Sequence, residues 1–174
     1  MKKIAVIYKS KYGTTEKYAN WIAEELGATL LEESKVKPTQ LAEYDIVVYG
    51  GWLFASKISG VKLVTGNPCK ALVVFSVGIT DPKTMDTQSI LKENFKPELL
   101  EKIKVFHLRG GVDFNKLGFI HKNLLNMVKS AAEKKTPEER SAEERAIVEA
   151  SSGSKSDFTD KASIAPLVEY VRTL

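Results

Sequence analysis

Short apolar runs alternate with helix-forming stretches along this chain. Five short runs predict the strands of a parallel sheet: Ile4–Tyr8, Ala28–Glu32, Tyr44–Tyr49, Lys70–Ser76 and Lys102–Leu108. The first, third and fourth are of the apolar kind that is buried on both faces. Apolar residues at three- and four-residue spacing predict helices at 14–26, 58–65 and 84–94, from Asn115 to about Lys135, and at the end of the chain. The alternation predicts one α/β domain over residues 1–174, doubly wound with helices on both faces of the sheet.

The turn between the first strand and the first helix is rich in hydroxyl groups. It reads Ser10, Lys11, Tyr12, Gly13, Thr14, Thr15. Backbone N–H groups of such a turn and the helix N-terminus point to one place, which favours an anion. Three hydroxyl donors and a glycine that allows close approach suit a phosphate, with Lys11 as an added cation. The alternative is that Thr14 simply caps the helix.

Two further strand ends carry candidate ligand contacts. Gly50, Gly51, Trp52, Leu53 and Phe54 follow the third run, and Val77, Gly78 and Ile79 follow Ser76 at the end of the fourth. Ligands of doubly wound sheets bind beyond the carboxyl ends of the strands. Trp52 offers a flat face for stacking, although Trp52 and Phe54 as core residues are an equal alternative.

The last third of the chain departs from simple strand–helix alternation. Leu117, Ile120, Leu124 and Val128 form one stripe of the helix after Asn115, with lysines on its other side. This stripe either packs on the sheet or lies on an anionic membrane surface. A charged helical insertion follows at about 133–157.

Capping residues and breaks mark the insertion and the final helix. Thr136, Pro137 and Glu139 form a capping box within the insertion. We expect 150–156 to be a flexible loop. In the final helix, Pro166 is awkward for a start at Thr159 and is tolerated if Ser163 is the N-cap, which places it in the first turn; the sequence leaves both starts open.

Composition and charge limit where the protein is expected to be located and what it is expected to bind. The net charge is +4, and segment 102–129 holds six Lys or Arg against one Asp. That segment is a candidate for peripheral contact with the inner face of a membrane. No apolar run approaches the roughly 20 residues of a membrane span, and no secretory signal is visible, so we expect a cytoplasmic protein. We expect no nucleic-acid partner.

Few side chains are suited to metal or nucleophile chemistry. Cys69 is the only cysteine, and His107 and His121 have no metal-ligand spacing, so no metal site is expected. His107 lies in an apolar run and is interpreted as a strand residue. The chain contains no G-x-x-x-x-G-K-[ST] motif, which disfavours a P-loop NTPase.

The turn Ser-Lys-Tyr-Gly-Thr-Thr resembles the phosphate loop of flavodoxins, hydroxyl-x-x-Gly-x-Thr, directly after the first strand. The stretches 109–119 and 157–160 are similar to the flavodoxin-domain branch that contains menaquinone-dependent protoporphyrinogen dehydrogenases. This resemblance implies strand order 2-1-3-4-5 and an FMN whose phosphate lies in the first turn. It also implies a flavin ring between the loops 50–54 and 76–79. Where flavodoxins usually carry an aromatic residue in the latter loop, this chain has Val77 and Ile79, which implies a more exposed ring or a partner surface over it.

Three functions are compatible with these residues. The first is an FMN electron carrier acting with a redox partner protein or a quinone. The second is an oxidoreductase that passes electrons from a tetrapyrrole to a quinone, favoured by the basic segment but without an assignable catalytic residue. The third is a flavodoxin-like binding module that has lost its cofactor.

Overall fold

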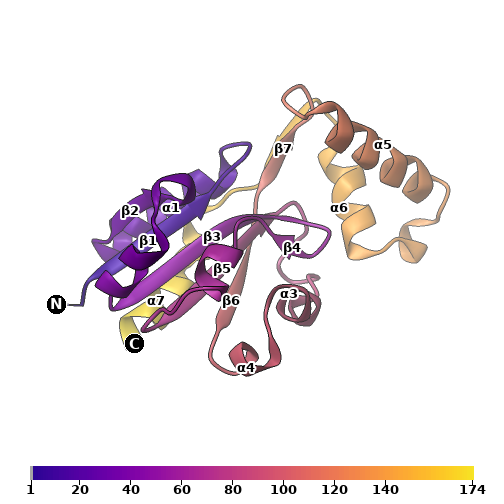
Figure 1. The fold of residues 1–174 in the computed structure, drawn as a ribbon. Coiled ribbons are helices and arrows are strands. Elements are labelled where there is room, and N and C mark those ends of the chain that lie inside the picture. Colours follow the sequence, from indigo (N-terminus) through magenta and orange to yellow (C-terminus); the bar gives the residue numbers. More distant parts are fainter. Residues whose placement is uncertain (1) are drawn as a thin grey trace.

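The computed structural model describes residues 2–174 and has the predicted α/β architecture (Figure 1). The strands are β1 (Ile4–Lys9), β2 (Thr29–Glu32), β3 (Ile46–Phe54), β4 (Lys57–Ile58), β5 (Leu72–Gly78), β6 (Lys104–Arg109), β7 (Gly111–Asp113) and β8 (Lys155–Asp157). The α-helices are α1 (Thr14–Leu26), α2 (Lys62–Thr65), α3 (Thr87–Asn94), α4 (Pro97–Leu100), α5 (Phe119–Glu133), α6 (Ala142–Ala150) and α7 (Ala165–Thr173). Short 3₁₀ turns are η1 (Glu33–Lys35), η2 (Pro38–Glu43), η3 (Pro137–Glu139) and η4 (Lys161–Ile164).

Five long strands form a parallel sheet in the order β2-β1-β3-β5-β6. This is the predicted order 2-1-3-4-5 when only the five expected strands are counted. A sixth, two-residue strand, β4, folds back antiparallel on the end of β3. None of the helices within residues 2–174 is long and apolar enough to cross a bilayer.

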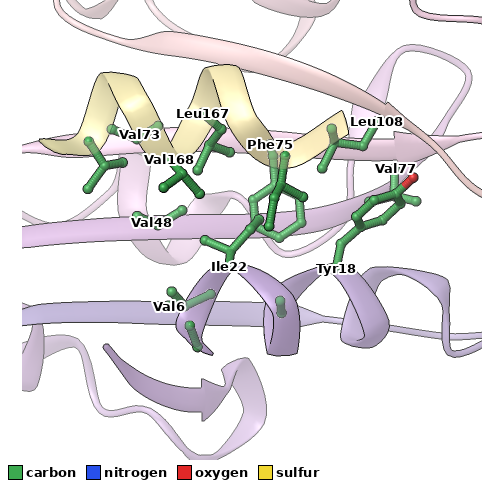
Figure 2. Close-up of a cluster of buried hydrophobic side chains, with 14 of the residues drawn as sticks. Val6, Tyr18, Ile22, Val48, Val73, Phe75, Val77, Leu108, Leu167 and Val168 are labelled. Carbon is green, nitrogen blue, oxygen red and sulfur yellow. The ribbon is translucent and has the colours of Figure 1, made fainter. Parts of the chain in front are cut away.

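Helices cover both faces of the sheet. On one face α1 and α7 bury Tyr18, Ile22 and Leu167 against Val48 and Phe75 of the central strands (Figure 2). The other face is covered by η2, α2 and α3, which contribute other buried apolar side chains such as Leu41, Val64 and Ile90. The buried strands therefore require apolar residues on both faces, which explains their continuous apolar runs.

The third strand is longer than predicted. We expected it to end at Tyr49, but β3 continues through Gly50 and Gly51 to Phe54. A Cβ atom at Gly50 would overlap the ring of Phe75, so this glycine makes room for a neighbouring core side chain.

Two helices that follow β3 and β5 start later than predicted. The segment expected as a helix from Ile58 begins with β4 and turns helical only at Lys62. Helix α3 starts at Thr87 rather than Thr84 because Asp86 caps it, accepting from the N–H groups of Gln88 and Ser89.

Helix α5 does not pack on the sheet. It lies beside α6 beyond the strand ends, and the two form a hairpin over residues 119–150 (Figure 1). The alternative that placed its apolar stripe on the sheet is therefore wrong. Its outer side leaves Phe119 and Ile120 exposed by 79% and 77%.

The segments around this hairpin are more ordered than predicted. The Thr136–Glu139 capping box is present, as the sequence indicated, and a second box joins Ser141 to Glu144 at the start of α6. The expected flexible loop at 150–156 instead enters β8, which pairs antiparallel with β7. Pro166 lies in the first turn of α7, as the second alternative placed it, but the cap is Ile164 and not Ser163.

Candidate functional site

A cavity of about 540 Å³ opens at the carboxyl ends of β1, β3 and β5 and beneath the α5–α6 hairpin. The strand-end loops contribute Tyr12, Thr14, Thr15, Trp52, Leu53, Phe54, Ala55, Ser56, Val77, Gly78, Ile79, Thr80 and Gly110. The hairpin and the segments leading to it and to α3 contribute Met85, Gly111, Val112, Leu117, His121, Leu124, Leu125, Val128, Glu143 and Ile147. The volume lies within the range of small-molecule and cofactor sites.

The first wall is the turn between β1 and α1. Gly13 caps α1 with φ +92°, a left-handed conformation, and no side chain caps the helix. The alternative in which Thr14 is the cap is therefore wrong. The Gly13 N–H donates to Ser10 Oγ over 3.1 Å, which tightens the turn. Thr15 is 1% exposed and its hydroxyl has no hydrogen-bond partner.

This turn has the properties of an anion site. An uncapped helix N-terminus leaves backbone N–H groups without acceptors, and its dipole favours negative charge. A buried hydroxyl without a partner costs free energy unless a ligand accepts from it. Lys11 is exposed at the rim, with Nζ 5.4 Å from the centre of the Trp52 ring.

The second wall is the end of β3 and its hairpin with β4. Trp52, Leu53 and Phe54 line the cavity, whereas Gly50 and Gly51 lie behind it within the strand. The centres of the Trp52 and Phe54 rings are 6.1 Å apart. These two aromatic residues are therefore cavity-lining and not core residues.

The hairpin turn beside this wall was missed by the sequence analysis. Ala55 and Ser56 both have positive φ, 46° and 60°, a conformation that residues with a Cβ rarely adopt. The Asn94 side chain holds the turn, donating to Ser56 C=O over 2.6 Å and accepting from Ile58 N–H over 2.7 Å. Backbone strain of this kind clusters at ligand sites.

The third wall follows β5. Val77, Gly78 and Ile79 line the cavity, but Ser76 faces away from it and is fully buried. The Ser76 hydroxyl donates to His107 Nδ1 over 2.9 Å, and His107 Nε2 donates to Thr80 C=O over 3.1 Å. Burial lowers the pKa of His107 to about 4, so this histidine is a neutral strand residue, as predicted.

The fourth wall is helix α5, which the sequence analysis did not assign to the site. His121 Nδ1 lies 3.1 Å from both Lys11 Nζ and Tyr12 Oη. The His121 ring centre is 5.7 Å from that of Trp52 and 5.1 Å from that of Phe54. The stripe of Leu117, Leu124 and Val128 that was noted in the sequence faces this cavity, with Ile120 outside it.

A single arginine joins the third wall to the hairpin. Arg109 Nε donates to Ile79 C=O over 3.0 Å, and its guanidinium group pairs with Glu149 of α6. The same group lies 3.9 Å from the centre of the Phe158 ring. The backbone of the third wall is thereby fixed relative to α6.

Other chemistry-bearing groups lie elsewhere. Within residues 2–174, no group of three or more His, Cys, Asp or Glu side chains is arranged to hold a metal ion. Cys69 is unpaired and distant from this cavity, and burial raises the pKa of its thiol to about 11.

Comparison with known proteins found similar solved structures but no curated relative. No curated protein matches the sequence. Similar solved structures include a flavodoxin from the domain Archaea, at 15% identity, 60% of this chain, 84% of that chain and a TM-score of 0.41. Flavodoxin 1 of Bacillus cereus matches at 20% identity, 62% of this chain, 84% of that chain and a TM-score of 0.42. A flavoprotein of Lactobacillus acidophilus, solved in complex with FMN, matches at 14% identity, 63% of this chain, 93% of that chain and a TM-score of 0.42.

The family of this chain follows from a comparison of its sequence with family models. A family model described as a flavodoxin domain matches residues 5–139, which run from the second residue of β1 through β7 and helix α5. This chain therefore belongs to the flavodoxin domain family.

Proposed function

We propose that this protein binds FMN and mediates electron transfer through it. The observation that carries the proposal is the buried Thr15 hydroxyl without a partner, at the uncapped N-terminus of α1. These groups match the terminal phosphate of FMN, which supplies the acceptor oxygens that they lack. The residues of the cavity thus fit the cofactor that the family implies.

Each wall has a distinct part in holding the cofactor. The turn Ser10–Thr15 binds the phosphate, and the flavin ring lies between Trp52–Phe54 and Val77–Ile79. Gly50, Gly51 and Ser76 contribute from behind these walls by fixing β3 and β5. Bound FMN supplies reversible electron transfer, and the protein orients the ring, excludes water and tunes the potential.

Reconstitution followed by a redox assay tests this function. The purified protein is mixed with FMN, passed through a desalting column, reduced anaerobically and mixed with a one-electron protein acceptor or a soluble quinone. We expect FMN to co-elute with the protein and the reduced form to be reoxidised by the acceptor. Co-eluting FMN that no acceptor reoxidises would contradict the electron-transfer role, whereas absence of FMN would contradict the binding site.

The second candidate is an oxidoreductase that passes electrons from a tetrapyrrole to a quinone. The observation that favours it is the apolar part of the cavity beneath the hairpin, where Leu124, Leu125 and Val128 provide space beside the flavin loops. A steady-state assay of the FMN-loaded protein with protoporphyrinogen and a quinone separates the candidates. Turnover supports the enzyme, and its absence together with rapid reoxidation by a protein partner supports the carrier.

Membrane contact through α5 is a further part of this proposal. Phe119, Ile120 and Met127 are exposed by 79%, 77% and 64%. Lys116 and Lys122 are exposed nearby, and the first turn of α5 has no acidic residue. Exposed apolar side chains flanked by lysines suit an anionic lipid surface, where each lysine contributes about 1 kcal/mol to binding.

Sedimentation with lipid vesicles tests the membrane contact. The wild-type protein should sediment with vesicles that contain anionic lipid and less with neutral ones. The double variant Phe119→Ser, Ile120→Ser should remain in the supernatant while its thermal stability stays unchanged, because both side chains are exposed. Equal sedimentation of the variant and the wild type would contradict the assignment of this surface.

A further inference from the structure

His121 of helix α5 contacts both the first and the second wall of the cavity. Its Nδ1 atom contacts Lys11 and Tyr12, and its ring packs edge-on against Trp52 at 78°. The Lys11 ammonium group can only donate, so His121 Nδ1 accepts and its Nε2 carries the hydrogen. The ring is thus held from two sides, by polar contacts at one nitrogen and by aromatic edges.

The hairpin is also attached at its other helix. Arg109 links Glu149 of α6 to the carbonyl group of Ile79 in the third wall. His121 and Arg109 together therefore connect the hairpin to the first, second and third walls of the cavity. A hairpin connected in this way is part of the cavity wall, although its residues lie far from those loops in the sequence.

The third wall lacks a flat side chain for a flavin ring. Val77 and Ile79 are both aliphatic, and the flat side chains that line the cavity are Tyr12, Trp52, Phe54 and His121. Of these four, His121 is the one that the hairpin contributes. His121 is therefore a candidate within the chain for covering the ring.

We propose that His121 is a flavin-binding residue and that the α5–α6 hairpin covers the cofactor. The proposal rests on the proposed FMN function and adds a fourth binding element to it. His121 limits escape of the flavin by its ring, and its Nδ1 atom contacts Lys11 and Tyr12 of the phosphate loop. Loss of this side chain should therefore speed cofactor release.

Two measurements test the proposal, one of which needs no flavin. In a Trp21→Phe background Trp52 is the remaining tryptophan, and its quenching by acrylamide reports whether the His121 ring covers it. The second measurement is the rate of FMN dissociation after dilution. The variants are His121→Ala, His121→Phe, which keeps a flat ring without an acceptor, and Asn123→Ala as an exposed control on the same helix.

We expect His121→Ala to raise the quenching of Trp52 and to release FMN about tenfold faster. A factor of ten corresponds to about 1.4 kcal/mol, the size of one hydrogen bond with an aromatic edge contact. His121→Phe should protect Trp52 as the wild type does while releasing FMN faster, and Asn123→Ala should match the wild type in both measurements.

These measurements distinguish a failure of the His121 proposal from a failure of the proposed FMN function. If the wild type binds FMN and His121→Ala releases it at the wild-type rate, the His121 proposal is overturned and the FMN function stands. If His121→Phe leaves Trp52 as accessible as His121→Ala does, the packing of the ring is wrong and the proposal is overturned. If the wild type binds no FMN, both proposals are overturned.

Discussion

Replacement of Thr15 by valine should have opposite effects on two quantities: it should stabilise the flavin-free protein and weaken its binding of FMN. The Thr15 hydroxyl is buried without a partner, and valine has nearly the same shape without the polar group. An unsatisfied buried polar group costs about 1–3 kcal/mol, so its removal should stabilise the flavin-free protein by about 1 kcal/mol. For a chain of this length that gain corresponds to roughly 2–4 °C in melting temperature.

The same replacement should weaken the binding of FMN. A hydrogen bond from Thr15 to a charged phosphate oxygen contributes about 1.5–3 kcal/mol. Its loss corresponds to a dissociation constant raised roughly tenfold to 150-fold. Riboflavin lacks the phosphate, so its affinity should not change.

Urea unfolding of the flavin-free protein and fluorescence titrations with FMN and riboflavin measure both effects. Thr29→Val is the matched control, because Thr29 is exposed on the edge strand β2 and should alter neither quantity substantially. Lower stability of flavin-free Thr15→Val, or equal weakening of FMN and riboflavin, would refute the assignment of Thr15 to the phosphate.

Three other changes test the cavity and the core. Gly13→Ala should destabilise the protein by about 1–2 kcal/mol, because φ is +92° there and nothing lies within 4 Å to obstruct a methyl group; urea unfolding that shows no loss would contradict this cause. Gly50→Ala should lower the melting temperature through a loss of about 1–3 kcal/mol, since its Cβ would overlap Phe75, and an unchanged value would contradict the packing. Burial lowers the pKa of His107 to about 4, so as the pH falls this histidine binds a proton in the unfolded state before it does in the folded state. The free energy of unfolding should have its full value above pH 6.5 and be lower by about 3 kcal/mol at pH 4, measured by urea unfolding relative to His107→Gln. A difference between the two proteins that does not change with pH would contradict this prediction.

The sheet could be predicted because its signal is local. The central strands β1, β3 and β5 are largely buried on both faces and therefore appear as apolar runs, as in Ile4–Tyr8. The Ser10–Thr15 turn was also visible, because its hydroxyl groups and glycine directly follow the first strand. Its final geometry, with Gly13 as the cap and Thr15 buried, depends on packing that the pattern does not contain.

The errors arose where distant residues decide the structure. The end of β3 was misplaced because Gly50 and Gly51 carry no apolar side chain, and their place in the sheet depends on Phe75 and on Ser59. Strand β8 was expected to be a loop because its only pairing partner, β7, lies more than 40 residues earlier.

The wall formed by α5 was missed for a related reason. The stripe of Leu117, Leu124 and Val128 was recognised, but periodicity shows only that a helix buries one face and does not show against what. His121 had no metal-ligand spacing and was set aside, although it lies in this stripe. A histidine among the apolar residues of a basic helix was the one signal that could have indicated a ligand contact.

Titration of the wild-type protein with FMN, followed by flavin fluorescence, tests the central claim most directly. The account predicts quenching that saturates at one FMN per chain, with much weaker binding of riboflavin because the Ser10–Thr15 turn then has no phosphate to bind. Flavin fluorescence that rises linearly with added FMN, without saturation and as for riboflavin, would contradict the proposed cofactor site.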